Sequence, residues 1–156
     1  TSTIEWLALM QHHGMPTRLL DFSKNPLVAL YFACSEKSWD EDGVVYSTKF
    51  TIKKNEVDGD LFTQQGNFTY FPHHISDRIT SQSGLFICCA APNKPLRGGL
   101  GNQVTKIMIS KSSKSMILSD LRDIGIHPGS IFPGLEGTCK SLSDILEQKL
   151  FTHYYF

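Results

Sequence analysis

The chain has 156 residues, a length that predicts one domain with a core of its own. Hydrophobic residues make up 40% and charged residues 19%, a balance that excludes a disordered low-complexity segment. The longest apolar runs, at residues 27–34 and 85–91, hold eight and seven residues, against about 20 for a membrane-spanning helix. Fifteen basic and fifteen acidic residues leave no excess charge that would favour nucleic acid or an anionic membrane as partner.

The N-terminal residues predict a helix with a defined start and end. Ser2 and Glu5 have the spacing of a capping box, and Gly14 followed by Pro16 ends the helix. The face expected to pack inward, at three- and four-residue spacing, comprises Trp6, Leu9, Met10 and His13.

A linker predicted at residues 17–24 leads to a second helix. Asn25 is a good N-cap, and Pro26 follows it at the first helical position. Residues 27–35 are apolar almost all round, so we expect this helix to be buried. The sheet against which it packs should contain the strands predicted at residues 85–89 and 104–109.

The rest of the chain predicts three strands and two helices. Short apolar or alternating runs place the strands at residues 44–46, 85–89 and 104–109, and weak periodicity with Gly and Pro marks loops at 50–75 and 92–102. Helices are expected at 116–124 and 141–150. The inward residues of the last helix should be Leu142, Ile145, Leu146 and Leu150. Helices at both ends of a strand-rich middle favour an α+β fold over alternating α/β.

The cysteine pattern argues against zinc and against disulfides. The cysteines are Cys34, Cys88, Cys89 and Cys139, and no Cys-x-x-Cys motif is present. We expect four free, buried thiols and an intracellular, cytoplasmic location. Because the sequence begins with Thr1 rather than Met, we also expect the chain to be a fragment or a processed piece.

The densest polar cluster spans residues 11–21 (QHHGMPTRLLD), between the two N-terminal helices. Arginine offers a forked donor for phosphate or carboxylate, and histidine titrates near neutrality, so Arg18, His12 and Asp21 are candidate site residues. Alternatively, Arg18 and Asp21 pair with each other across the turn while His13 sits on the apolar face. We expect a combination, in which Asp21 orients Arg18 through a partly buried pair and His12 faces a cleft.

A second polar segment, residues 78–86 (RITSQSGLF), enters the strand predicted at 85–89. Polar residues at the start of a central strand often edge a pocket, which makes Arg78 and Gln82 candidates; the alternative is an ordinary corner with Arg78 in solvent. Two weaker candidates follow. His73 and His74 lack a third metal ligand, and the glycines at 97–101 lack the Lys-Ser/Thr of a P-loop.

Together these segments resemble the FRG domain family. Residues 11–23 (QHHGMPTRLLDFS) and 26–34 (PLVALYFAC) closely resemble its hallmark stretch, while 78–86 and 131–137 (IFPGLEG) look like its downstream blocks in the same order. The blocks span most of the chain, so the resemblance implies an FRG-type domain over residues 1–156. The Phe-Arg-Gly tripeptide that names the family is absent. The resemblance implies that it lies upstream, so that this chain corresponds to the C-terminal two-thirds of the domain.

FRG domains look similar in element order to ADP-ribosyltransferase folds. The resemblance therefore implies a single domain with a central split mixed sheet, flanked by helices, that holds NAD in its cleft. Gln82 would contact the nicotinamide ribose, and His12 or Asp21 would act as general base. The side chains implied to bind NAD are Arg18, Ser23, Tyr31 and Arg78. Transferases place a glutamate where Gln82 stands, and a glutamine cannot ionise.

The leading hypothesis for function is NAD-dependent ADP-ribosyl transfer or NAD cleavage, with an unidentified macromolecule as acceptor. The alternative is a non-catalytic module that binds a nucleotide, a nucleic acid or a protein, which the missing tripeptide and the missing glutamate both favour. A nucleotide hydrolase is a third hypothesis, provided that His12 acts as a base. We expect no membrane partner, and an N-terminal fragment of the same domain is a further candidate partner.

Overall fold

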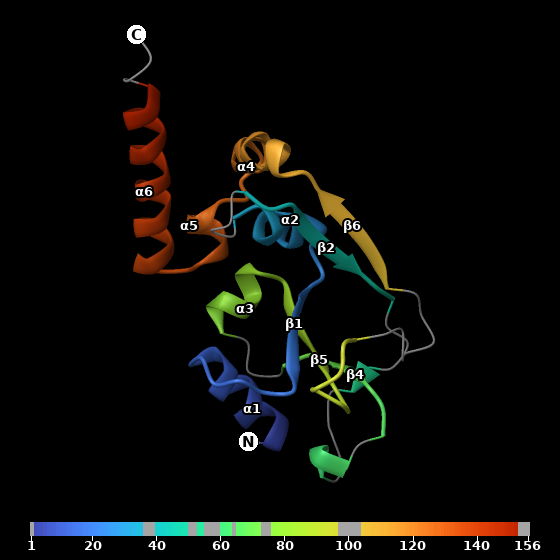
Figure 1. The fold of residues 1–156 in the computed structure, drawn as a ribbon. Helices are drawn as coiled ribbons and strands as arrows, with labels where there is room; N and C mark the ends of the chain where they lie inside the picture. Colours follow the sequence, from blue (N-terminus) through green and yellow to red (C-terminus); the bar gives the residue numbers. More distant parts are fainter. Residues whose placement is uncertain are drawn as a thin grey trace.

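Four strands form the larger of two sheets in the computed structural model (Figure 1), which describes residues 2–35, 40–49, 53–54, 60–63, 65–72, 76–96 and 104–152. Their order is β1 (Leu19–Ser23), β5 (Gly84–Cys88), β4 (Phe68–Tyr70) and β3 (Lys53–Lys54). The sheet is mixed, because β5 is antiparallel to β1 and β4 whereas β3 runs parallel to β4. The predicted linker at 17–24 is therefore wrong, since β1 lies within it and pairs with a distant strand.

The smaller sheet contains β2 (Gly43–Ser47) and β6 (Thr105–Ile109), which are antiparallel. The prediction that the strands at 85–89 and 104–109 share one sheet is wrong. A strand has two edges, and those of β5 are occupied by β1 and β4, so β6 pairs with β2 instead. α2 (Pro26–Ser35) contacts β1, β2 and α4 (Lys114–Asp123), and so connects the two sheets (Figure 1).

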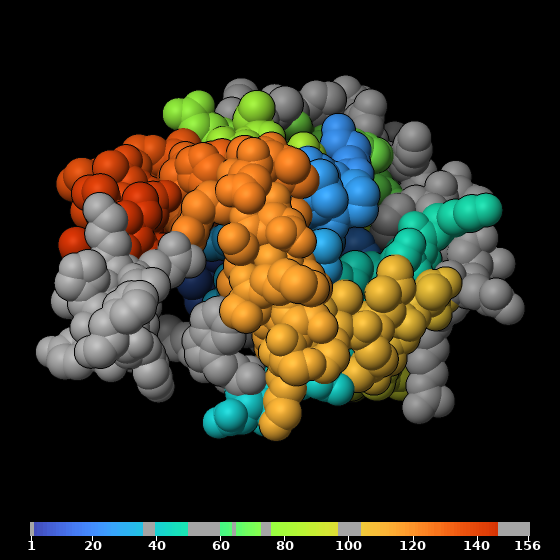
Figure 2. Space-filling view, turned by 90° about the horizontal axis from the view of Figure 1, so that it is seen from above, coloured from blue at the N-terminus to red at the C-terminus, as the bar shows by residue number. Residues whose placement is uncertain are grey.

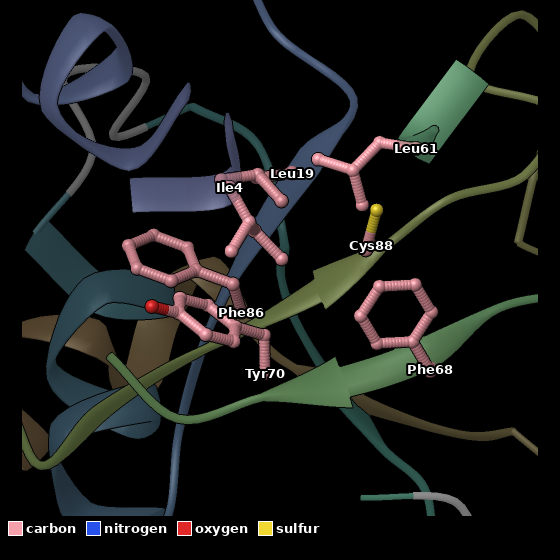
Figure 3. Close-up of a cluster of buried hydrophobic side chains, with 7 residues drawn as sticks. All are labelled: Ile4, Leu19, Leu61, Phe68, Tyr70, Phe86 and Cys88. Atoms are coloured by element: carbon pink, nitrogen blue, oxygen red, sulfur yellow. The ribbon is translucent and has the colours of Figure 1, made fainter. Parts of the chain in front are cut away.

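The main core lies between one face of the larger sheet, α1 (Thr3–His12) and the short 3-10 helix η1 (Leu61–Thr63) (Figure 3). Alternate residues of a strand point to the same face, which brings Phe68 with Tyr70, and Phe86 with Cys88, into one layer. The seven buried side chains of this cluster are Ile4, Leu19, Leu61, Phe68, Tyr70, Phe86 and Cys88.

α1 begins as predicted but packs through a different face. Ser2 and Glu5 form the capping box, in which the Glu5 carboxylate accepts from the Ser2 amide at 2.7 Å. Trp6 and Leu9, predicted to point inward, are exposed, whereas Ile4 is buried. The apolar residues of α1 cover more than one face, so periodicity predicts the helix without selecting the side that meets the sheet.

A second buried cluster joins α2 and α4 to α5 (Pro128–Ile131) and comprises Tyr31, Leu121, Ile131 and Phe132. α2 was predicted to be buried all round. Its buried residues are instead Val28, Tyr31 and Cys34, a single stripe at three-residue spacing. Leu27 and Phe32, on other faces, are 38% and 36% exposed.

The last helix is α6 (Leu135–Thr152), which begins six residues before the predicted start at Ser141. The face that it turns toward the rest of the molecule is not the one that was predicted. Leu142, Ile145 and Leu146 were predicted to be inward but are 54%, 42% and 59% exposed. The side chain of Leu150 lies outside the described residues. Figure 2 shows α6, in red-orange, at one flank of the molecule. The helix is held by polar contacts of Ser141 and Asp144 with the α4–α5 region, a pattern that hydrophobic periodicity does not detect.

The coarse architecture agrees with the sequence. Helices and small sheets are mixed as the α+β prediction requires, α4 covers the helix predicted at 116–124, and β2, β5 and β6 match the three predicted strands. η2 (Lys111–Ser113) leads directly into α4. Across the described ranges, no helix has both the length and the apolar character needed to cross a bilayer.

All four thiols are free, as predicted, but Cys139 is exposed on α6 rather than buried. Burial raises the pKa of Cys34 and of Cys89, an effect that the charges of Lys114 and Arg18, respectively, oppose. Because the thiolate is the reactive form, both buried groups should react slowly near neutral pH.

We expect a disulfide reagent such as 5,5′-dithiobis(2-nitrobenzoate) to modify one thiol rapidly in the folded chain and all four after unfolding. Cys139→Ser should abolish the rapid phase, because Cys139 is the exposed thiol. A rapid phase of two or more thiols in the folded wild-type chain would contradict this burial pattern.

Candidate functional site

The corner between β1 and α2 holds Ser23 against the segment that precedes β5. The Ser23 hydroxyl donates a hydrogen bond to the Gln82 backbone carbonyl at 2.7 Å, across 59 residues of sequence. The backbone N–H of Lys24 donates to the Ser83 carbonyl at 3.0 Å. The β1–β5 register places Ser23 opposite Gly84, which brings these groups together. Two residues implied to contact NAD, Ser23 and Gln82, are therefore neighbours.

Gln82 is the C-cap of α3 (Asp77–Ser81) and lies two residues before β5. Its side-chain amide Nε2 donates to the Ile131 carbonyl, at the end of α5, at 3.4 Å. Ser83 follows with a φ of 49°, a left-handed conformation that turns the chain sharply into β5. The amide of Gln82 thus links α3 to α5.

The side chain of Phe132 is the centre of a group of charged residues from two helices. The Arg78 guanidinium carbon, on α3, lies 5.3 Å from the centre of its ring, and the Lys140 ammonium, on α6, lies 4.0 Å from it. Such cation–π contacts hold both charges beside an aromatic face. Lys140 also forms a salt bridge with Glu136 at 2.7 Å. We call Arg78, Phe132, Glu136 and Lys140 the Phe132 cluster.

Positive charge dominates around Glu136. The hydrogen bond and the charge of Lys140 lower the pKa of the Glu136 carboxyl, and the charges of Arg78 and His12 act in the same direction. His12 lies at the end of α1, with its ring centre 5.3 Å from that of His13 in an edge-on arrangement. Three cations, from α1, α3 and α6, therefore act on the one carboxylate of Glu136.

Tyr31 belongs to the second core rather than to a ligand-facing surface. It is buried in one hydrophobic cluster with Leu121, Ile131 and Phe132. Burial raises the pKa of its hydroxyl, the charge of Asp144 adds to this, and a hydrogen bond with Ser35 opposes it. The Phe32 ring packs edge-on against both Tyr31 and Phe132, with ring centres 5.6 and 6.0 Å away.

Arg18 and Asp21 make separate contacts, so the predicted pair between them is wrong. Arg18 donates to the Leu61 carbonyl at 2.9 Å, and its guanidinium carbon lies 4.7 Å from the centre of the Phe62 ring. The Asp21 carboxylate accepts from the side-chain amide of Gln11 at 2.8 Å. Arg18 lies at the bend before β1 and reaches η1, whereas Asp21 lies within β1 and reaches the end of α1.

An open hollow of about 360 Å³ lies where α1 meets β1. Gln11 spans it, with its amide bonded to Asp21 and its carbonyl accepting from the Thr17 hydroxyl. The Thr17 hydroxyl oxygen in turn accepts from the Leu19 amide at 3.0 Å. The hollow is lined by Gln11, Gly14, Met15, Pro16, Thr17, Leu19 and Asp21, without His12.

The structure thus brings Ser23, Arg78 and Gln82 together around the end of α5. The charge of His12 acts on Glu136 of the Phe132 cluster, and Arg18 lies at η1 instead. Sequence reasoning missed the roles of Phe132, Glu136 and Lys140. The block at 131–137 carried a signal, because it resembled a family motif, but no site role was assigned to it.

His73, His74 and the glycines at 97–101 lie outside the described residues. Among the described residues, no group of three or more His, Cys, Asp or Glu side chains is placed to hold a metal ion.

Comparison with known proteins agrees with the resemblance at the N-terminus. Residues 1–42 match the FRG domain family. This match supports the FRG family for the segment that contains α1, β1 and α2. No curated protein and no solved structure matches the chain.

Gly137 sets the distance between α6 and the turn that carries Phe132. A Cβ at position 137 would lie 1.8 Å from the Phe132 carbonyl oxygen and 2.7 Å from that of Pro128. We expect Gly137→Ala to lower the free energy of unfolding by about 1–3 kcal/mol, because overpacking exceeds the gain in helix propensity. Gly66→Ala is the control, since nothing lies within 4 Å of its added Cβ. Equal denaturation midpoints for the two variants would contradict this packing.

The polar contacts of Asp21 can be tested with two double-mutant cycles measured by urea denaturation. We expect Gln11→Ala and Asp21→Ala to show a coupling energy of about 0.5–1 kcal/mol, because they share a hydrogen bond. The cycle of Arg18→Ala with Asp21→Ala should show coupling near zero. A larger coupling in the second cycle than in the first would restore the predicted Arg18–Asp21 pair.

Proposed function

We propose that this chain is an FRG-type domain that binds NAD or a related nucleotide at the Phe132 cluster and the adjoining Ser23–Gln82 corner. The observation that carries the proposal is the placement of two cations, Arg78 and Lys140, on one aromatic ring. Arginine and lysine bind phosphate oxygens, and the buried Phe132 ring holds both cations through cation–π contacts. A dinucleotide offers a diphosphate to this pair of cations.

The reaction proposed at this site is ADP-ribosyl transfer from NAD to an acceptor. The bond between nicotinamide and ribose breaks, the ribose gains oxocarbenium-like character, and the acceptor nucleophile then bonds to the same carbon. Gln82 supplies hydrogen bonds at this position but no negative charge. Of the two candidate bases, His12 is exposed at the end of α1, whereas the Asp21 carboxylate is engaged by Gln11.

The second candidate function is a non-catalytic module that binds the same nucleotide. One observation favours it: the Gln82 amide donates to the Ile131 carbonyl, so it already has a structural partner. A side chain engaged in this way fixes α3 against α5, and would have to release this bond in order to contact a ribose.

The proposal includes an ADP-ribosyltransferase-like fold and a cytoplasmic location. It also includes an N-terminal fragment of the same domain as a partner.

We expect calorimetry with NAD to show saturable binding that Arg78→Ala weakens by about tenfold, as loss of a charge-assisted contact requires. Lys106→Ala is the matched control, because Lys106 is an exposed cation on β6 in the smaller sheet. Release of nicotinamide by the wild-type chain, reduced in Gln82→Ala and in His12→Ala, would support transfer or cleavage.

The outcomes separate the two functions. Binding of NAD without nicotinamide release would favour the non-catalytic module. Absence of NAD binding, or equal affinities for wild type and Arg78→Ala, would refute the proposed site. Circular dichroism of each variant establishes that a loss of binding is not a loss of fold.

A further inference from the structure

The cations of the Phe132 cluster face an acidic side chain of their own chain. The Lys140 ammonium lies 2.7 Å from the Glu136 carboxylate and 4.0 Å from the centre of the Phe132 ring. Arg78 approaches the same ring from α3, with its guanidinium carbon 5.3 Å from the ring centre. A carboxylate therefore sits among cations in the position where an anionic ligand group would be recognised.

The chemistry of this arrangement matches a phosphate better than a carboxylate. The carboxylate of Glu136 carries one negative charge, against the two positive charges of Lys140 and Arg78. A diphosphate carries more charge and more acceptor oxygens than a carboxylate, and both Arg78 and Lys140 lie beside the Phe132 ring. The side chains of Lys140 and Glu136 are 47% and 55% exposed, so a ligand can reach them.

We propose that Lys140 and Arg78 bind the diphosphate of the nucleotide, and that Glu136 competes with it for Lys140 as a built-in anionic mimic. The identity of the ligand as a nucleotide rests on the proposed function above, whereas the competition by Glu136 rests on the cluster alone. Glu136 thereby sets the affinity of the site, because a ligand must displace its carboxylate from the Lys140 ammonium.

The displacement requires motion of one exposed side chain and leaves the rest of the cluster in place. Pairs at i,i+4 on a helix surface are weak, so the Glu136–Lys140 bond can be exchanged for a phosphate contact. The backbone beneath it is fixed, because Gly137 packs directly on the Phe132 and Pro128 carbonyl oxygens. The Phe132 ring and the base of Lys140 therefore keep their positions while the carboxylate turns away.

The test uses the complete chain and inorganic pyrophosphate as the probe, with dissociation constants from calorimetry. We expect Glu136→Gln to bind pyrophosphate about two- to five-fold more tightly than wild type, the change that corresponds to losing one exposed competing charge. Lys140→Ala and Arg78→Ala should each bind more weakly than wild type. Asp123→Asn is the charge-matched control, because it removes an exposed carboxylate from α4, and its affinity should equal that of wild type.

Three results would overturn the inference: no pyrophosphate binding in any variant, unchanged or weaker binding in Glu136→Gln, or equal tightening in Asp123→Asn. The last would mean that overall charge governs affinity. Competition with NAD distinguishes this inference from the proposed function. If Glu136→Gln tightens pyrophosphate binding while NAD neither binds nor competes, the anion site stands and the proposed function fails. If NAD binds and needs Arg78 but is indifferent to Glu136, the proposed function stands and the inference fails.

Discussion

The antiparallel pairing of β1 with β5 is the constraint on which the candidate site depends. It places Ser23 opposite Gly84, so the corner that starts α2 meets the turn between α3 and β5. The Ser23 hydroxyl and the Lys24 amide then donate hydrogen bonds to the carbonyls of Gln82 and Ser83, at the turn where Ser83 has a φ of 49°. A shift of the register by one residue would turn Ser23 to the other face of the sheet and break this junction.

A second close contact extends the site to the C-terminal part of the chain. The missing side chain of Gly137 lets α6 lie directly on the backbone of the preceding turn, and this turn presents Phe132. α5 is tied to α3 by the Gln82 amide and to α6 by the Gly129 amide, which donates to the Ser141 hydroxyl at 2.8 Å. Arg78 and Lys140 reach one ring because both of these links converge on the same short helix.

Local signals in the sequence predicted individual helices and strands well, but they predicted poorly which distant segments these elements pack against. The capping box of Ser2 and Glu5 and the Asn25 cap, whose carboxamide oxygen accepts from the Leu27 amide, depend on residues within one helical turn. β1 was missed because a strand at residues 19–23 is stabilised by pairing with β5 rather than by its own composition. The faces of α1 and α6 were wrong for a related reason: an apolar stripe predicts a helix, whereas the surface that meets it decides which stripe is buried. For the candidate site, Arg78 and Gln82 were found from the polarity of the segment that enters a strand. Lys140 was not found, because its role depends on the Phe132 ring, eight residues earlier, and on α3, which is distant in the sequence.

The charges in the candidate site bear on the chemistry proposed for it. Stabilising an oxocarbenium-like ribose requires negative charge or strong acceptors, and Gln82 contributes no charge. The acidic side chain of the Phe132 cluster, Glu136, is engaged by the Lys140 ammonium, and Asp21, in the hollow between α1 and β1, is engaged by the Gln11 amide. In the proposed exchange, a diphosphate takes Lys140 and the Glu136 carboxylate turns away from the ammonium. The carboxylate is charged in both arrangements, so the exchange changes its position and adds no negative charge for breaking a ribosyl bond.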